Sequence, residues 1–306
     1  MAVFETVTDG LRFPEGPVVM PDGSVIVTEI EQGKITRVKP DGSKEVVATT
    51  GGGPNGLALG PDGKLYCCNN GGFEYAEANG YLAPHGIAND YSGGRIERID
   101  IATGQVEILY KSGDHGCVLR GPNDIVFDEH GGFWFTDHGK VDYAKRCHDI
   151  VGIFYAKTDG SHLEEVIFPS NNPNGVGLAP DGRALYAAET YTCRLMKFNI
   201  TAPGKVAPDA GPGGPGIPLY RPAGYKFFDS LAMEANGNIC VATIGECGIS
   251  VIAPEGELVE FVATDDIFTT NIAFGGDDMM DAYITLSGSG RLVKTRWNRP
   301  GLKLNY

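Results

Sequence analysis

The chain has 306 residues, and its 39 acidic and 25 basic side chains give a formal net charge of −14. Glycine (44 residues) and proline (19 residues) together form about a fifth of the chain. That share is too small for a collagenous or disordered protein and too large for a helix bundle, because both residues destabilise helix interiors. The composition therefore predicts an all-β protein with many short strands and tight turns.

The acidic balance argues against binding to nucleic acid, which requires clustered Lys and Arg, and suits a soluble protein that binds cations. No run approaches the roughly 18 apolar residues of a membrane span, and the first residues lack a secretory pattern. The seven cysteines are scattered without a CxxC pair, which is typical of reduced thiols. We therefore expect a cytoplasmic protein with no nucleic-acid or membrane partner.

An internal repeat recurs six times along the chain. Each copy has a polar first residue, an apolar alternation, a turn and a second apolar run. The copies begin at Glu15, Asn55, Asn123, Asn174, Asp229 and Asn271. Eight positions later stand Gly23, Gly63, Gly131, Gly182, Gly237 and, as the exception, Met279. Because Asp-Gly and Asn-Gly between β-rich runs form tight turns, each copy is predicted to be a β-hairpin.

Further strands are predicted after each hairpin, at Lys34–Val38, Arg95–Ile99, Gly152–Ala156, Arg194–Phe198, Ile249–Ile252 and Leu292–Thr295. About four strands per repeat of roughly 50 residues predict a six-bladed β-propeller that spans 1–306 as one domain. The run Val3–Val7 would add an outer strand to the last blade and close the ring. A β-sandwich or barrel is the alternative, but neither explains six copies in one register.

Two segments depart from the repeat. They are 71–94 in the second copy and 201–224 in the fourth, and both are rich in turn-forming residues. We expect surface loops there, with a lid or an oligomer contact as the alternative.

The six polar first residues are predicted to meet on one face of the propeller, because the first strand of each blade lines the central channel. This ring has two carboxylates and four amides and no His or Cys. Such oxygen ligands suit a hard cation such as Ca²⁺, whereas zinc prefers imidazole or thiolate. A single polar residue at a strand start can simply bind backbone or water, but six in one register favour a metal site in the central channel.

A second layer of side chains is expected where each hairpin returns to the same face. Fourteen residues after the strand starts stand Glu29, Asn69, Asp137, Ala188, Thr243 and Thr285, with Glu189 one place beyond Ala188. His138 could project into the mouth of the channel, with a position in a surface loop as the alternative, and Arg120 could also reach the mouth.

The motifs FPEGPVV, GPNDIVFDEHGGFWFTD, NPNGVGLAPDGRALYAAET and FFDSLAMEANGNICVA resemble those of the SMP-30/gluconolactonase/luciferin-regenerating-enzyme family of six-bladed propellers. The resemblance covers essentially the whole chain. It implies a divalent metal held by Glu15, Asn123, Asn174 and Asp229, with Asn55 and Asn271 behind the ligands or in the pocket.

The sequence also departs from that family. Gly121 stands where the animal sugar-lactonase branch has an Arg, with Arg120 one residue earlier. His138 stands where bacterial gluconolactonases commonly have a proline. These differences bear on the identity of the lactone and leave the metal ligands untouched.

The resulting hypothesis is a metal-dependent hydrolase, a lactonase that opens a small cyclic ester. Its metal would be Ca²⁺ in the first place, with Zn, Mn or Fe as alternatives. Asp229 is the expected general base, and Asp137 or Glu29 is the reserve. The expected substrate-binding residues are Asn55, Asn271, Asp137, His138, Glu29 and Arg120.

Three other interpretations remain open. The same site could cleave phosphotriesters, as in the similar diisopropylfluorophosphatase, or the chain could be a non-enzymatic calcium-binding propeller. A propeller similar to strictosidine synthase would need no such ligand set. The chain is expected to act as a monomer or a homodimer.

Overall fold

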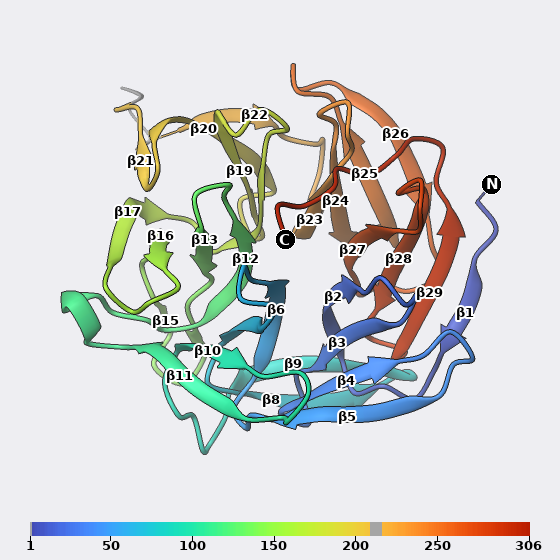
Figure 1. Ribbon diagram of the computed structural model, residues 1–306, viewed down its shortest axis with the longest axis horizontal. Helices are drawn as coiled ribbons and strands as arrows, with labels where there is room; N and C mark the ends of the chain where they lie inside the picture. The colour runs from blue at the N-terminus through green and yellow to red at the C-terminus, as the bar shows by residue number, and fades with distance from the viewer. Residues whose placement is uncertain (1, 209–215) are drawn as a thin grey trace.

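Six hairpins at the predicted positions form the inner halves of six β-sheets arranged in a ring (Figure 1). The computed structural model describes residues 2–208 and 216–306. Within them the sheets have four strands each, except the fourth, which has five. The six-bladed, all-β arrangement predicted from the repeat is therefore confirmed.

The strands of each blade run from the channel outward. Blade 1 holds β2 (Pro14–Val19), β3 (Val25–Glu29), β4 (Lys34–Val38) and β5 (Lys44–Thr49). Blade 2 holds β6 (Pro54–Leu59), β7 (Leu65–Asn69), β10 (Arg95–Ile99) and β11 (Val106–Lys111). Blade 3 holds β12 (Pro122–Phe127), β13 (Gly132–Asp137), β16 (Val151–Lys157) and β17 (Leu163–Ser170).

The second half of the ring follows the same plan. Blade 4 holds β18 (Pro173–Leu178), β19 (Ala184–Glu189), β20 (Arg194–Ala202), β21 (Lys205–Val206) and β22 (Ile217–Tyr220). Blade 5 holds β23 (Phe227–Met233), β24 (Ile239–Ile244), β25 (Gly248–Ile252) and β26 (Leu258–Ala263). Blade 6 holds β27 (Thr269–Gly275), β28 (Asp281–Leu286), β29 (Arg291–Arg296) and β1 (Glu5–Thr8). The outer strand of blade 6 thus comes from the N-terminal segment, as predicted, because β1 pairs with β29.

The two segments that depart from the repeat differ in structure. Segment 71–94 forms a separate hairpin of β8 (Phe73–Ala78) and β9 (Tyr81–Ile87). In segment 201–224 the structure places β21 and β22 at the edge of blade 4, while 209–215 lie outside the described residues. Blade 3 carries a further small hairpin of β14 (Val141–Asp142) and β15 (Cys147–His148), and a short 3₁₀ turn, η1 (Asp114–Gly116), precedes it.

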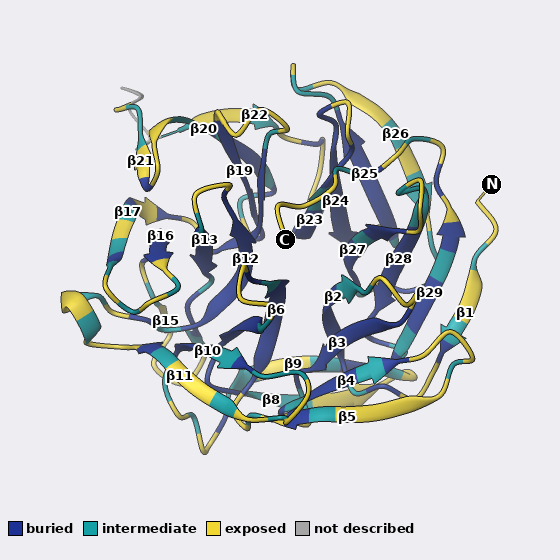
Figure 2. Ribbon diagram, viewed as in Figure 1, coloured by how far each residue is buried: buried dark blue, intermediate teal, exposed yellow. Residues whose placement is uncertain are grey.

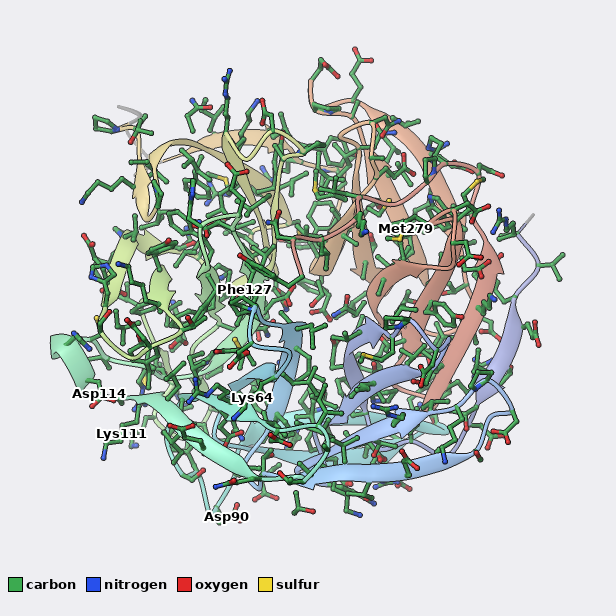
Figure 3. All side chains as sticks on the ribbon, in the orientation of Figure 1. Lys64, Asp90, Lys111, Asp114, Phe127 and Met279 are labelled. Atoms are coloured by element: carbon green, nitrogen blue, oxygen red, sulfur yellow. The ribbon has the colours of Figure 1, made fainter. Side chains whose placement is uncertain are left out.

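The hairpin turns explain the repeated glycine. Gly23, Gly63, Gly131, Gly182 and Gly237 all have φ between 68° and 94°, a left-handed conformation that only glycine adopts without strain. The sixth copy keeps the same turn although its residue is Met279, which has φ 57° (labelled in Figure 3). The exception in the sequence is therefore not an exception in the fold.

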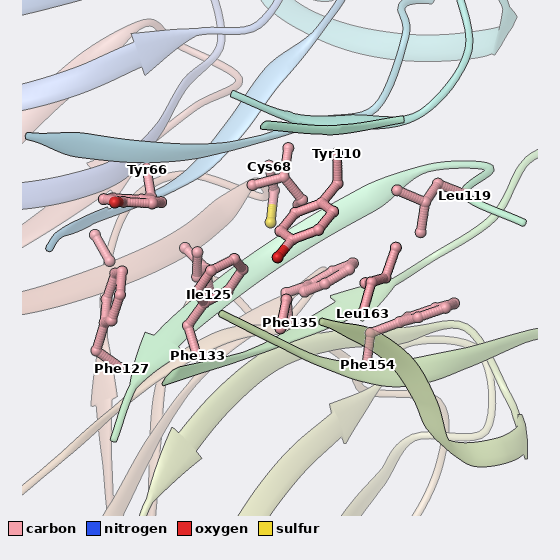
Figure 4. Close-up of a cluster of buried hydrophobic side chains, with 13 residues drawn as sticks. Tyr66, Cys68, Tyr110, Leu119, Ile125, Phe127, Phe133, Phe135, Phe154 and Leu163 are labelled. Carbon is pink, nitrogen blue, oxygen red and sulfur yellow. The ribbon is translucent and has the colours of Figure 1, made fainter. Parts of the chain in front are cut away.

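The hydrophobic core lies between neighbouring blades rather than at the centre of the ring. Inner and middle strands are buried, whereas outer strands such as β5 and β26 are largely exposed (Figure 2). The cluster between blades 2 and 3 is rich in aromatic rings, including Tyr66, Phe133 and Phe154 (Figure 4). Because the blades are fixed by this packing, the strands around the axis are held rigidly.

The C-terminal tail covers the end of the channel where the inner strands finish. Leu302 N–H donates to the carbonyl of Met233 in blade 5, and Asn305 Nδ2 donates to the carbonyl of Phe127 in blade 3. The chain ends near the centre of the ring (Figure 1). The strand-start face is therefore the opposite end of the channel. Among the described residues no helix has the length and apolar character needed to cross a membrane.

Glycines after the strand starts allow the inner strands to pack closely in a ring. The strands contact each other in the cyclic order β2, β6, β12, β18, β23 and β27. A Cβ on Gly16 would lie 2.4 Å from the carbonyl oxygen of Asn55, and one on Gly56 would lie 2.5 Å from that of Asn123. Such distances are sterically impossible, so glycine sets the width of the ring.

We therefore expect Gly16→Ala to destabilise the protein much more than Gly63→Ala. Both residues have positive φ, but Gly63 has open space around it. Backbone strain alone should cost about 1 kcal/mol at Gly63, and the collision with β6 should raise the loss to about 3 kcal/mol or more at Gly16. Equal losses in urea-induced unfolding would contradict this account of the ring.

Candidate functional site

The six predicted ring residues are all buried where the inner strands begin. Their exposed fractions are between 3% and 8%. All six inner strands have an irregular register at or beside this position, such as that between Glu15 and Val18 in β2. Because a β-bulge re-aims a side chain out of the regular alternation, these irregularities turn the polar residues toward the axis.

Glu15 lies in direct contact with the ring residue of the last blade. Its Oε2 accepts a hydrogen bond from Asn271 Nδ2 at 2.8 Å and another from the N–H of Gly16 at 2.9 Å. The Oδ1 of Asn271 accepts from the N–H of Ile272. Both polar ends of the Asn271 side chain thus have a protein partner, and its amide orients the Glu15 carboxylate.

Asn123 and Asn174 each present a buried oxygen without a protein partner. Among the described residues, Oδ1 of both side chains is buried and accepts no hydrogen bond. The other end of Asn174 is fixed, because Nδ2 donates to Thr190 Oγ1 at 3.1 Å. Buried polar atoms are normally bonded, so two free amide oxygens at equivalent strand starts indicate a ligand.

Three carboxylates share this buried region. Burial, and then the charge of Glu15, raise the pKa of Asp229 well above its usual range, and burial also raises the pKa of Glu15. The third is Asp124, whose pKa burial raises to about 7 against hydrogen bonds from Ile125 and Val176. A nearby cation would remove this penalty by favouring the charged forms.

The arrangement could hold a hard divalent cation through oxygen atoms. The candidate ligands are the carboxylates of Glu15 and Asp229 and the free amide oxygens of Asn123 and Asn174. Within 2–208 and 216–306, no group of three or more His, Cys, Asp or Glu side chains is placed to hold a metal ion. Any cation here would therefore depend on the amides, which is the chemistry expected for Ca²⁺.

The predicted second layer has a different role at four of its positions. Glu29, Asn69 and Asp137 pair with the proline that precedes the ring residue of their blade, and in blade 4 the paired residue is Glu189 rather than Ala188. Blade 4 differs because its hairpin turn is one residue longer.

These second-layer side chains bind the loop that leads into each inner strand. Glu29 accepts from the N–H of Arg12, Asn69 from that of Gly53, and Glu189 from that of Asn171. Asp137 accepts three backbone N–H groups, those of Arg120, Gly121 and Gly139. Their oxygens fix the backbone that carries the ring residues.

His138 and Arg120 are placed differently from each other. The ring of His138 meets Tyr191 edge to face at 5.8 Å, and burial lowers the pKa of His138 to about 4, so its imidazole is neutral at neutral pH. Tyr191 lines a pocket of about 270 Å³ together with Arg194, Arg221 and Tyr225. Arg120 instead pairs with Asp149 at 3.0 Å and lies over the ring of Tyr91.

Sequence reasoning missed Asp124. It directly follows a ring residue, at a position where three other copies have glycine: Gly16, Gly56 and Gly175. A carboxylate at a position otherwise occupied by glycine was the available signal. Asp124 also bridges blades, because its Oδ2 accepts from the N–H of Val176 in β18.

The family described as SMP-30/gluconolactonase/LRE-like region matches residues 13–288 of the chain. Lactonase drp35 of Staphylococcus haemolyticus is 29% identical over 250 residues, which cover 81% of this chain and 68% of that relative. Lactonase drp35 of Staphylococcus epidermidis is 27% identical over 238 residues, which cover 77% of this chain and 64% of the relative. The chain thus spans about two thirds of the length of these curated relatives.

Solved structures share the fold. A Xanthomonas campestris protein described as a gluconolactonase has a TM-score of 0.75 at 20% identity, with 96% of this chain and 89% of that chain covered. A calcium-binding protein, regucalcin, from Agrobacterium tumefaciens has a TM-score of 0.73 at 18% identity, with 99% and 98% covered.

The buried carboxylates predict how stability depends on pH when no cation is present. An unfolded Asp has an ordinary pKa near 3.8, whereas folding raises that of Asp124 to about 7. The folded state therefore holds a proton that the unfolded state releases, and stability falls as the pH rises from about 4 to about 7. The contribution of Asp124 is at most about 4 kcal/mol.

The comparison is between the parent and Asp124→Asn, unfolded by urea at several pH values in the presence of a chelator. The parent should lose more stability than the variant between pH 4 and pH 7, and added Ca²⁺ should restore part of the loss at pH 7. Parallel pH profiles would show that Asp124 is not protonated in the folded protein.

Proposed function

This chain belongs to the SMP-30/gluconolactonase/LRE-like family, and we propose that it is a lactone hydrolase that uses one divalent cation in the central channel. The observation that carries the proposal is the pair of buried, unpartnered oxygens of Asn123 and Asn174. They stand in the same ring as the buried carboxylates of Glu15 and Asp229. The relatives named lactonase and gluconolactonase support lactones as the substrate class.

Glu15, Asn123, Asn174 and Asp229 would hold the cation, as the sequence predicted. When bound, a divalent cation supplies Lewis acidity toward the lactone carbonyl and the negative charge that develops there. Two neutral amides among the four ligands leave the site with a low negative charge. Asn271 keeps Glu15 oriented, and Thr190 does the same for Asn174.

Asp229 is our choice for the general base that takes a proton from the attacking water. Burial and Glu15 raise its pKa in the cation-free protein and a bound cation would lower it, so the choice rests on its place in the ring beside the cation that would hold the water. Asp137 and Glu29 are less suited, because both oxygens of each already accept hydrogen bonds, from backbone N–H groups at Asp137 and from Arg12 N–H and Thr36 Oγ1 at Glu29. Of the other predicted contacts, we favour the neutral imidazole of His138, which lies beside Tyr191, as a substrate-binding group.

The first test is a panel of sugar, alkyl and aromatic lactones, with acid release followed by a pH indicator. We expect turnover of at least one lactone, a loss of at least about 100-fold after removal of divalent cations by a chelator, and recovery with Ca²⁺, Mn²⁺, Zn²⁺ or Fe²⁺. Full activity of the chelated protein would refute the role of the cation. Turnover of a neutral phosphotriester but of no lactone would favour the phosphotriesterase alternative, and a cation bound without any turnover would favour the non-enzymatic one.

A charge-removing variant tests the ligand set. Glu15→Gln should weaken cation binding by about 100-fold, because it removes one of two charged ligands and keeps the side-chain volume. Glu45→Gln is the matched control, since Glu45 is exposed on the outer strand of the same blade and should leave the affinity unchanged. Calorimetry measures both. An affinity of Glu15→Gln within twofold of the parent would place the cation elsewhere.

A further inference from the structure

The inserted hairpin β8–β9 stands on the strand-start face of the propeller. It follows β7, whose last residue, Asn69, pairs with Pro54 immediately before the ring residue Asn55. In Figure 1 the hairpin is the faded pair of strands behind β4, on the face away from the C-terminal tail. The insertion is therefore located at the end of the channel opposite the C-terminal tail.

The hairpin extends from blade 2 past blade 1 to blade 6. Leu82 N–H donates to the carbonyl of Gly288 at 2.8 Å. On the way, Leu82, Phe73 and Tyr75 pack with Phe13, Ile30 and Phe268 in one apolar cluster. Glu77 adds an ion pair with Arg12 at 2.8 Å. The far end is thus attached to two other blades.

The base of the hairpin is fixed by a buried lysine. Lys140 Nζ donates to Asn70 Oδ1 at 3.0 Å and to the carbonyl of Gly72 at 2.9 Å, and it lies 3.3 Å from the centre of the Phe73 ring. Burial lowers the pKa of Lys140 well below its usual range. The hairpin is therefore anchored at both ends and is not a free loop.

The anchored hairpin contains a buried hydroxyl that has no partner among the described residues. Tyr75 packs its half-buried ring against Phe13 at 5.3 Å, two residues before Glu15, while its hydroxyl oxygen is buried and unbonded among the described residues. Asn70 Nδ2, at the base of the hairpin, is a second buried donor without a partner there. Leaving such a group unpaired is unfavourable, so a ligand atom is the expected partner.

We propose that Tyr75 is a substrate-binding residue whose hydroxyl donates a hydrogen bond to an oxygen of the lactone. The inference rests on the proposed function and adds a contact that comes from the insertion rather than from the ring. Burial, and then the charges of Glu15 and Glu31, raise the pKa of Tyr75, so the hydroxyl keeps its proton.

The test compares the parent with Tyr75→Phe and with Tyr143→Phe. The largely exposed side chain of Tyr143 stacks on His85 of the inserted hairpin. Tyr143→Phe is therefore a matched control, because it also removes one tyrosine hydroxyl but does so away from the six ring residues. Kinetics with the best lactone of the panel give kcat and KM, and calorimetry gives the Kd of the corresponding lactam, which is not hydrolysed. Cation content and melting temperature are measured for all three proteins.

For Tyr75→Phe we expect KM and the lactam Kd to rise about tenfold, as for one lost hydrogen bond, with kcat reduced by less than about threefold. Cation content and melting temperature should match those of the parent, and Tyr143→Phe should be unchanged throughout. A lactam Kd of Tyr75→Phe within twofold of the parent would overturn this inference while the parent's lactone turnover still stood. A parent that neither hydrolyses a lactone nor binds a lactam would overturn the proposed function and this inference with it.

Discussion

Buried negative charge near the propeller axis is the constraint on which the site depends. Glu15, Asp124 and Asp229 are each at most 8% exposed, and none has a lysine or arginine among its hydrogen-bond partners in the described residues. Such carboxylates are stable only when protonated or when a cation neutralises them. Burial therefore raises the pKa of all three carboxylates, and a cation that binds here would release protons from the site.

The fold holds these charges in place through successive layers of backbone contacts. Gly16 and Gly56 allow the inner strands to approach, and irregular register at each strand start turns one polar side chain inward. Behind them, Asp137 and its equivalents bind the loops that enter the strands. The backbone N–H groups of these loops find their partners in Asp137 and its equivalents, so the hydrogen bonds that hold the scaffold also position the site.

The repeat made the fold and the ring predictable, because a fixed register converts distant residues such as Glu15 and Asn271 into neighbours. Register alone could not separate candidate ligands from scaffold. Glu29 and Asp137 stand at equivalent positions of their repeats, as the ring residues do, but the oxygens of Glu29 already accept from Arg12 N–H and Thr36 Oγ1, and those of Asp137 from backbone N–H groups. The longer turn that moves Glu189 into the place of Ala188 became evident only from strand pairing. The contact of the β8–β9 hairpin with Gly288 joins residues far apart in the sequence, so no local sequence pattern could predict it.

Unpartnered buried atoms separate function from scaffold where register does not. In the described part of the chain, five buried side-chain nitrogen or oxygen atoms lack a hydrogen-bond partner. Two are the ring oxygens of Asn123 and Asn174, and two belong to the inserted hairpin and its base, Tyr75 and Asn70. The fifth, Arg37 Nε, lies 3.8 Å from a carboxylate oxygen of Glu45 on the outer part of blade 1. Two are acceptors suited to a cation and two are donors suited to a neutral oxygen ligand. A cation would satisfy the two acceptors, and the hydrogen bond proposed from Tyr75 to a lactone would satisfy one of the two donors, which a cation alone would not do.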